Sequence, residues 1–278
     1  MTRTLLVGPW VGEFGFEVAL WAPHARRVAR DYDHVTVACE PGHEALYGDF
    51  ADEFELFPVP DDVVVRDCEY GHTTTALGSS APKLELPPLR VADHWLHPYR
   101  LRKTMTWEWG SMPYMPEGTF EVRGLGEQPK PERGRPHLVF HARNDHKQSI
   151  KAWPIEKWDE LSIRLNEAAK VCVGSIMGAH SVARTEDLIG KPISQVAGFM
   201  FMADLVVGSA SGPMALAMHS GTPCVWWADT SQNAHLLYEQ SGPVAACWNP
   251  HGVKHYRAAD TWDPSVDQVF AAVEEALA

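Results

Sequence analysis

A run of small residues, 208–213, links two apolar segments, and it is the first place where the residue types suggest chemistry. Glycine lets a ligand approach the backbone closely, and the N–H groups at a helix start carry partial positive charge that favours an anion such as a diphosphate. Ser209, Ala210, Ser211 and Gly212 are therefore candidate anion-binding positions, with hydroxyl groups on the two serines. A plain tight turn between a strand and a helix explains the same residues.

Positive side chains gather in a second segment, which also follows an apolar run. Arg143 lies in residues 141–147, where a guanidinium group at a strand end can bind a phosphate through two hydrogen bonds. Lys147 and Lys151 could add charge, and Lys151 precedes a predicted helix start, where a cation is unfavourable unless an anion lies beside it. The alternatives are a solvated polar loop and, for Lys151, a side chain that points into water.

A glycine-rich loop near the N-terminus carries two carboxylates, Glu13 and Glu17. A carboxylate beside a ligand can take the proton of a hydroxyl group, so either residue could act as a general base. Acidic residues are also favoured in the first turn of a helix, which is the structural alternative. The glycine spacing over residues 8–17 differs from the dinucleotide-binding fingerprint, and Glu40 alone stands near the position of its acidic residue, so NAD binding gains little support.

These residues need elements to position them, and apolar runs alternate with helix-like segments in both halves of the 278-residue chain. That alternation predicts parallel sheets with crossover helices, the α/β class. We predict strands at residues 4–7, 34–39, 137–141, 170–173, 203–208 and 223–227. We predict helices at residues 13–30, 154–170 and 213–219, and a last helix that is capped by Asp263 and Pro264.

The polar, proline- and glycine-rich stretch 124–136 is typical of a linker. We therefore predict two domains, an N-terminal domain over residues 1–133 and a C-terminal domain over residues 134–278. Ligands bind at the carboxyl ends of the strands in open parallel sheets. The candidate residues of both domains are accordingly expected to line a cleft between them.

Composition restricts the classes of partner. The formal net charge of −12 weighs against general binding to nucleic acid or to an anionic membrane surface. Five cysteines without CxxC spacing predict reduced, mostly buried thiols, and the histidines show no HExxH order, so we expect no metal site. No signal peptide and no apolar stretch of about 18 residues is visible, so we expect a cytoplasmic protein.

Two blocks of sequence resemble a known family. Residues 151–158, KAWPIEKW, resemble the K-x-W-P segment of heptosyltransferase-like (family 9) glycosyltransferases, which have the GT-B fold. Residues 202–217, followed by 221–223, resemble their A-D-L-x-I-G-x-D-S-G-x-x-H-L-A…G-T-P block. Ala210 and Ala215 stand where that block has aspartate and histidine, so heptose transfer is not implied.

Shorter stretches extend the resemblance. Glu13 follows a glycine like the Gly-Asp pair of that family, and Glu17 stands six residues before Pro23 as their pair stands before a helix proline. Residues 141–145, HARND, are similar to the H-x-R-x-G-D motif of fucosyltransferases of the same architecture, whose arginine binds the donor phosphates.

The resemblance implies two Rossmann-like domains that face a cleft and a glycosyltransferase that moves a sugar from a nucleotide-diphosphate donor to an acceptor hydroxyl. The reaction would be inverting and metal-independent, with the nucleotide-sugar as co-substrate and no cofactor. Arg143, Lys151 and residues 209–212 would hold the diphosphate, and Glu13 or Glu17 would deprotonate the acceptor. Thr230, at the start of the segment 230–235, would reach the nucleoside.

Other functions remain open at this point. A nucleotide-sugar epimerase shares this architecture, and so would a non-catalytic protein that binds a nucleotide-sugar. The sequence does not identify the sugar or the nucleotide. The acceptor is a glycan, a small molecule or a nucleobase, and the net charge of −12 weighs against the last.

Overall fold

The computed structural model describes residues 2–10, 14–56, 58, 65–66, 74–75, 92–96, 134–144, 149–176, 178–229 and 248–278. The chain divides into two compact units, Met1–Phe120 and Glu121–Ala278. The linker predicted over residues 124–136 lies mostly outside the described residues, so the boundary after residue 133 stays a prediction.

The N-terminal unit is built on a four-stranded parallel sheet with the strand order β3-β2-β1-β6. Its strands are β1 (Thr4–Val7), β2 (His34–Cys39), β3 (Glu53–Leu56) and β6 (His94–Leu96), beside a separate antiparallel pair of β4 (Val65–Arg66) and β5 (Thr74–Thr75). Strand β2 is buried from its second residue to its last, as expected of a central parallel strand that is covered on both faces. The strands predicted at residues 4–7 and 34–39 are confirmed.

One helical segment connects β1 to β2. It consists of α1 (Phe14–Phe16), the π-helix η1 (Glu17–Trp21) and α2 (Ala22–Ala29), and a short 3₁₀ turn, η2 (Glu44–Leu46), follows β2. Pro23 lies in the first turn of α2, directly after the π-helix ends at Trp21. The predicted helix is thus confirmed from residue 14 onward, and its π-helical part is a conformation that is often found at functional sites.

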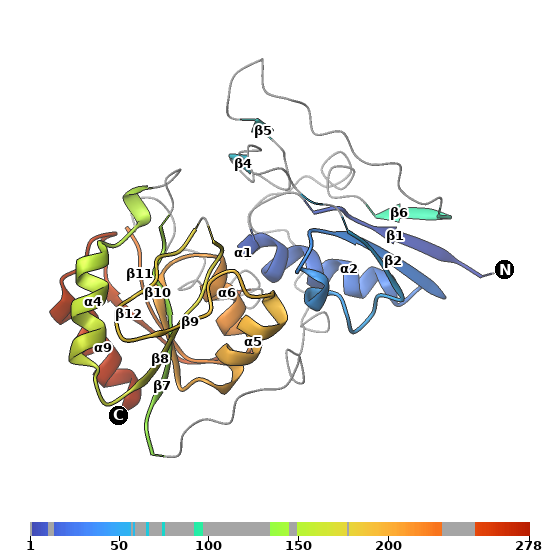
Figure 1. The fold of residues 1–278 in the computed structure, drawn as a ribbon. Helices are drawn as coiled ribbons and strands as arrows, with labels where there is room; N and C mark the ends of the chain where they lie inside the picture. Colours follow the sequence, from blue (N-terminus) through green and yellow to red (C-terminus); the bar gives the residue numbers. More distant parts are fainter. Residues whose placement is uncertain are drawn as a thin grey trace. The chain divides into compact units, whose positions relative to one another are not determined.

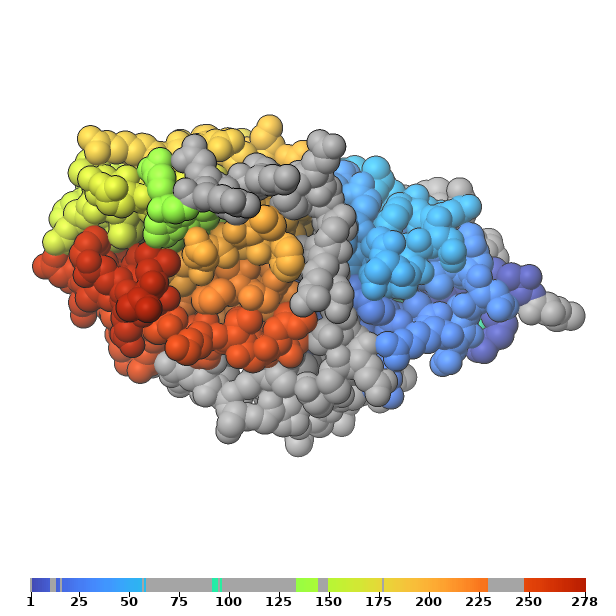
Figure 2. All heavy atoms as spheres, turned by 90° about the horizontal axis from the view of Figure 1, so that it is seen from below, coloured from blue at the N-terminus to red at the C-terminus, as the bar shows by residue number. Residues whose placement is uncertain are grey.

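The C-terminal unit contains a six-stranded parallel sheet with the order β12-β11-β10-β7-β8-β9. Helices α4 and α9 cover one face of this sheet, and α5 and α6 cover the other (Figure 1). Figure 2 shows the yellow-green atoms of α4 beside the red atoms of α9. The strands are β7 (His137–His141), β8 (Ala169–Cys172), β9 (Glu186–Asp187), β10 (Leu205–Ser209), β11 (Cys224–Trp227) and β12 (His255–Ala259). The helices are the 3₁₀ turn η5 (Ser149–Lys151), α4 (Ile155–Arg164), α5 (Ile193–Met202), α6 (Gly212–His219) and α9 (Val266–Leu277).

Two predicted helix boundaries are wrong. The helix predicted over residues 154–170 ends at Arg164, because Leu165 leaves the helical conformation (φ −88°, ψ 42°) and the chain turns into β8 at Ala169. The last helix is capped by Ser265, not by Asp263. The Ser265 hydroxyl accepts a hydrogen bond from the Gln268 amide at 3.2 Å, and the Gln268 side chain accepts one from the Ser265 amide at 2.8 Å.

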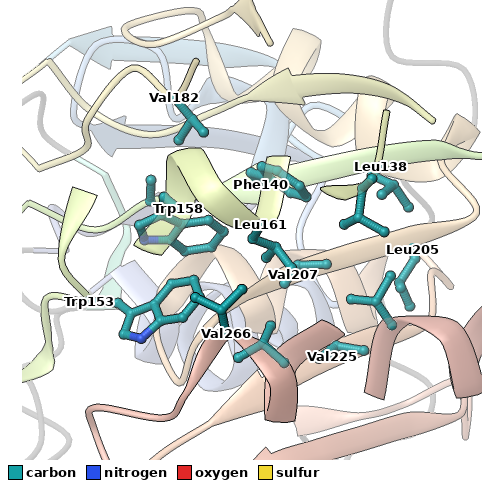
Figure 3. Close-up of a cluster of buried hydrophobic side chains, with 14 of the residues drawn as sticks. Leu138, Phe140, Trp153, Trp158, Leu161, Val182, Leu205, Val207, Val225 and Val266 are labelled. Carbon is teal, nitrogen blue, oxygen red and sulfur yellow. The ribbon is translucent and has the colours of Figure 1, made fainter. Parts of the chain in front are cut away.

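Tryptophans contribute to the C-terminal core, and Figure 3 shows Trp153 and Trp158 among its side chains. The Trp153 ring lies 5.1 Å from the rings of both Trp158 and Trp227, measured between centroids, and all three side chains are buried. The indole N–H group of Trp153 donates to the Pro264 carbonyl at 2.9 Å. The core therefore fixes the chain just after Lys151 against the turn that precedes α9.

No helix in the described part of the chain is both long and apolar enough to cross a membrane. The described residues also contain no group of three or more potential metal ligands. Three of the five cysteines lie in the described part, and these, Cys39, Cys172 and Cys224, are buried free thiols. Burial raises the pKa of each thiol, that of Cys172 to about 11, so these thiols are unreactive at neutral pH.

Candidate functional site

Two of the segments singled out in the sequence start at the same end of the C-terminal sheet. Strands β7 and β10 are parallel neighbours, and Gly208 pairs in register with His141. The chain therefore leaves both strands side by side, into the segment with Arg143 and into the small-residue run that opens α6. This carboxyl end of the sheet is where ligands bind in open α/β folds.

His141 joins the two segments. The Ser211 hydroxyl and His141 Nδ1 are hydrogen-bonded at 3.1 Å. The His141 side chain is buried, and this burial, reinforced by the charge of Arg143, lowers its pKa to about 3. The imidazole is therefore neutral at physiological pH. Ser211 is the N-cap residue of α6, yet its side chain makes no capping hydrogen bond, because the hydroxyl bonds to the imidazole.

Two glycines leave the space that the His141 ring occupies. A Cβ atom on Gly208 would lie 3.3 Å from His141 Cβ and 3.0 Å from Met214 Sδ. A Cβ atom on Gly174 would lie 2.4 Å from Ala179 Cβ and 3.4 Å from His141 Cδ2, and its φ of 148° is itself unusual for other residues. The packing at this end of the sheet is therefore tight: a side chain at Gly174 would first meet Ala179, and one at Gly208 would meet Met214 and His141.

Next to the hydrogen-bonded pair of His141 and Ser211, two hydrogen-bond donors have no partner among the described residues. The Ser209 hydroxyl is buried and has no hydrogen-bond partner in the structure. At the start of α6, Pro213 has no N–H group and the amides of Met214 and Ala215 bond to the Ser211 carbonyl, so among the described residues the Gly212 amide is left open. A buried polar group without a partner costs about 1–3 kcal/mol, which a bound anion would recover.

Ala210 differs from its neighbours in the predicted anion-binding run. Its backbone N–H donates to the Trp227 carbonyl at 2.9 Å, so it extends the pairing of β10 with β11. The side chain is small and buried. Ala210 therefore shapes the turn, and its amide is already used by the sheet.

Arg143 lies two residues beyond the end of β7 and is half-buried. It forms an isolated antiparallel bridge with Ala179, and the neighbouring Asn144 amide donates to the Gly178 carbonyl at 2.9 Å. These bonds tie the loop after β7 to the loop after β8. The backbone of Arg143 is thus fixed at the same end of the sheet as His141 and Ser209.

Lys151 has a contact that its sequence position did not predict. Its ammonium group lies 5.2 Å from the centroid of the Trp262 ring, a cation–π contact with the turn before α9. An anion beside the helix start is therefore not required to explain this lysine. Lys147 and Thr230, the other predicted donor-binding residues, lie outside the described residues.

The N-terminal unit has a polar cluster around Glu17. The Glu17 side chain is 2% exposed, and both carboxylate oxygens accept hydrogen bonds, Oε1 from the Tyr47 hydroxyl at 2.6 Å and Oε2 from His43 Nδ1 at 2.7 Å. His43 and Tyr47 lie 26 and 30 residues along the chain from Glu17, so no local spacing in the sequence pointed to them. Glu13 lies outside the described residues.

The charges around His43 set its protonation. Burial lowers the pKa of this imidazole, but the carboxylate of Glu17, its hydrogen bond, and the charges of Glu40 and Glu44 together raise the pKa above its ordinary value of 6.5. Burial and Glu17 raise the pKa of Tyr47 well above 10, so its hydroxyl stays protonated and donates. The cluster therefore holds a buried carboxylate against one basic imidazole.

Comparison with solved structures identifies the fold. The E. coli ADP-heptose LPS heptosyltransferase II aligns over 99% of this chain and 98% of its own, with 14% identity and a TM-score of 0.53. A family 9 glycosyltransferase from Veillonella parvula aligns over 99% and 97%, with 14% identity and a TM-score of 0.56. The E. coli heptosyltransferase WaaC, solved with ADP, aligns over 99% of both chains, with 12% identity and a TM-score of 0.51.

In sequence the chain matches no family model and no curated protein. The likeness is therefore one of fold, carried by nearly the whole length of each structure. It confirms the architecture that the sequence motifs implied: the chain has the GT-B fold of the heptosyltransferases.

Proposed function

We propose that this protein is a glycosyltransferase that moves a sugar from a nucleotide-diphosphate donor to an acceptor hydroxyl. The observation that carries the proposal is the set of donors at the carboxyl ends of β7 and β10. There, the buried Ser209 hydroxyl and the Gly212 amide have no partner among the described residues, and Arg143 starts from the same end of the sheet. These groups suit an anion, in a fold shared with enzymes of sugar transfer.

The diphosphate of the donor would bind at this end of the sheet. Ser209 and Gly212 would donate to its oxygens, and the Arg143 guanidinium would supply the charge, since His141 is neutral. Lys147, Lys151 and Thr230 remain further proposed contacts. Positive charge placed at the leaving diphosphate stabilises it in the transition state, so we propose transfer without a metal ion or cofactor.

The acceptor would react at the N-terminal unit. An inverting transfer needs a base that takes the proton of the acceptor hydroxyl, and Glu13 and Glu17 are the proposed sources of that base. The acceptor is a glycan, a small molecule or a nucleobase. The buried free thiols of Cys39, Cys172 and Cys224 support a place in the reducing cytoplasm.

A panel of UDP-, GDP-, ADP-, CMP- and dTDP-sugars tests the proposal in a thermal-shift assay. The correct donor raises the melting temperature, because it binds the folded state alone. Ser209→Ala and Arg143→Ala are expected to reduce the rise, because each weakens donor binding. Ser220→Ala is the matched control, because it removes a buried hydroxyl at the other end of α6, where it bonds to the Leu216 carbonyl.

An assay of donor turnover distinguishes a glycosyltransferase from the two alternatives, a nucleotide-sugar epimerase and a non-catalytic binding protein. Transfer to an acceptor, or slow hydrolysis of the sugar–phosphate bond with inverted anomeric product, is the result that we expect. Interconversion of sugars without an acceptor would identify an epimerase instead. Tight binding with no turnover in the presence of glycan and small-molecule acceptors would identify a non-catalytic binding protein.

A further inference from the structure

Glu17, His43 and Tyr47 form a hydrogen-bonded cluster at the carboxyl end of the N-terminal sheet. Glu17 opens the π-helix that follows β1, and His43 precedes the 3₁₀ turn that follows β2. Because β1 and β2 are parallel neighbours, their downstream segments meet at the same end of the sheet. The cluster therefore occupies the place in this unit where a ligand of an α/β domain binds.

Glu17 is badly placed to take a proton from an acceptor. Its side chain is 2% exposed, and each carboxylate oxygen already holds a hydrogen bond, from Tyr47 at 2.6 Å and from His43 at 2.7 Å. A general base needs an oxygen or nitrogen within hydrogen-bond reach of the substrate. The Glu17 carboxylate instead holds the ring of His43 in one orientation and one tautomer, since an ionised carboxylate only accepts hydrogen bonds.

His43 is better placed. Its Nδ1 carries the proton that Glu17 accepts, which leaves the lone pair on Nε2. The ring is 18% exposed, and Nε2 lies 3.9 Å from Oε2 of Glu40, a side chain that is 43% exposed. The Phe14 ring packs edge-on against the imidazole at 5.4 Å and helps to fix its plane.

We propose that His43 is the general base of the transfer reaction and that Glu17 is its positioning residue. This inference rests on the proposed glycosyltransferase function and replaces a direct role of Glu17 as base. Nε2 of neutral His43 takes the proton of the acceptor hydroxyl while the acceptor oxygen attacks the anomeric carbon. The bond between that carbon and the phosphate oxygen breaks, and its electron pair leaves with the nucleoside diphosphate. The proton on Nε2 then passes to water.

The charged groups around the imidazole predict a pH profile. Glu17 faces it from η1, and Glu40 and Glu44 face it from the segment after β2. The pKa of His43 is raised above 6.5, and the protonated ring cannot act as a base. On acidification, activity is therefore expected to be lost at a pH above 6.5.

Further ionisable groups adjoin the Glu17 side of the cluster. Cys39 ends β2 and stays a thiol, and Tyr47 stays protonated. Arg26 of α2 donates to the Leu46 carbonyl at 3.2 Å and pairs with Asp49, so its charge is held by those groups. The charges that raise the pKa of the imidazole against its burial are therefore those of the three carboxylates.

Substitution of His43 is the first test, with the donor that gives the largest thermal shift and with water or the identified acceptor as nucleophile. His43→Gln is expected to lower kcat by about 100-fold or more, the usual contribution of a general base, while the donor still raises the melting temperature as in the wild type. His34→Gln, at a partly exposed histidine beside Asp52, is the control and keeps full activity.

Two variants of the supporting groups give a readout that a purely structural role would not move. Glu17→Gln removes the negative charge beside Nδ1 of His43 and so lowers the pKa of the imidazole. The acid limb of the pH–rate profile then moves to lower pH. Tyr47→Phe removes a donor from Glu17, which strengthens its bond to His43 and moves the limb to higher pH. Imidazole NMR titration of His43 in each variant follows the same shifts without any activity assay.

The outcomes distinguish the two proposals. If no nucleotide-sugar binds, the proposed function fails and this inference fails with it. If the donor binds and turns over but His43→Gln keeps activity within about threefold, or Glu13→Gln alone abolishes activity, only the assignment of His43 is overturned. If His43→Gln does not fold, unchanged acid limbs in Glu17→Gln and Tyr47→Phe overturn it in the same way.

Discussion

His141 and His43 are both largely buried, yet their surroundings move their pKa values in opposite directions. Burial and the Arg143 guanidinium lower the pKa of His141, whereas the carboxylates around His43 outweigh burial and raise its pKa. One imidazole is thus a neutral hydrogen-bonding group, and the other is a stronger base than free histidine. The difference suits His141 to positioning Ser211 and suits His43 to the proposed proton transfer.

The titration of His141 predicts a pH dependence of stability. Its pKa is about 3 in the folded protein and about 6.5 when unfolded, so the unfolded state binds the proton first on acidification. The contribution to stability is complete above pH 6.5 and is lost as the pH falls toward 3, by up to about 1.4 kcal/mol per pH unit. Urea unfolding of wild type and His141→Asn is compared between about pH 7 and about pH 4. The free energy of unfolding is expected to change less steeply with pH in the variant. Equal slopes would contradict the buried, neutral state.

The hydrogen bond between Ser211 and His141 predicts a second effect. Ser211→Ala leaves His141 Nδ1 buried without a partner, so the free energy of unfolding should fall by about 1–2 kcal/mol. The affinity for the nucleotide-sugar should fall as well, because the turn that carries Ser209 and Gly212 loses its hydrogen bond to His141 of β7. Ser220→Ala is expected to cost similar stability but no affinity. Equal donor affinity in both variants, measured by thermal shift, would contradict this role of Ser211.

The sequence singled out Ser209, Ser211 and Gly212 as candidate anion-binding positions, which remain a prediction, and it singled out neither histidine. Arg143 and the serine run stand out because each follows an apolar run. His43 and Tyr47 reach Glu17 only because β1 and β2 pair in parallel, which brings together residues 26 and 30 positions apart. Pairings of that kind depend on strand order, which local spacing does not encode.

Among the elements, helix starts differ in how their first amides are satisfied. α9 begins with a reciprocal capping box, whereas the N-cap serine of α6 bonds to a histidine and leaves the Gly212 amide open among the described residues. A capped start serves stability, and an open one is suited to an anion.

The cap of α9 provides a stability prediction. Ser265→Ala is expected to lower the free energy of unfolding by about 1 kcal/mol, because the Gln268 amide loses its acceptor. Asp263→Asn should cost about 0.5 kcal/mol or less, since its ion pair with Lys157 is at the surface. Chemical denaturation measures both. A larger loss of stability for Asp263→Asn than for Ser265→Ala would instead support Asp263 as the cap, as predicted from the sequence.

Substitutions of two glycines, Gly8 after β1 and Gly42 after β2, are expected to differ in their cost to stability. Gly8 and Gly42 both have positive φ, 87° and 92°, but a Cβ atom on Gly8 would lie 2.4 Å from the Ala38 carbonyl oxygen. A Cβ atom on Gly42 would meet no atom of the described residues within 4 Å. Gly42→Ala should cost about 1 kcal/mol from its backbone conformation, and Gly8→Ala about 1–3 kcal/mol more. Comparable denaturation midpoints for the two variants would contradict the close approach of β1 to β2.

Central strands were predictable because strands buried on both faces are continuous apolar runs, as in β2, β7 and β10. Helix α5 was missed because its sequence, ISQVAGFMFM, has little contrast between its faces. Strand β12 was missed because it lies at the sheet edge and carries polar residues, HYRAA.

At the scale of the whole molecule, the fold is that of enzymes with only 12–14% identical residues. The sequence motifs that pointed to it lie mainly in the C-terminal unit, in residues 151–158 and 202–223. The substitutions of Ala210 and Ala215 within those motifs affect the turn and a buried helix position, and the backbone that forms the turn is retained. The fold therefore tolerates alanine at both of these positions.

The proposed binding of a nucleotide-sugar depends most on the anion site at the ends of β7 and β10. The most direct test is calorimetric titration of the full chain with the nucleoside diphosphate of the donor found in the panel. We predict one site per chain, about 10- to 100-fold weaker in Arg143→Ala and weaker in Ser209→Ala, with wild-type affinity in Ser220→Ala. No heat of binding from any nucleoside diphosphate, or equal affinity in all four proteins, would contradict the central claim.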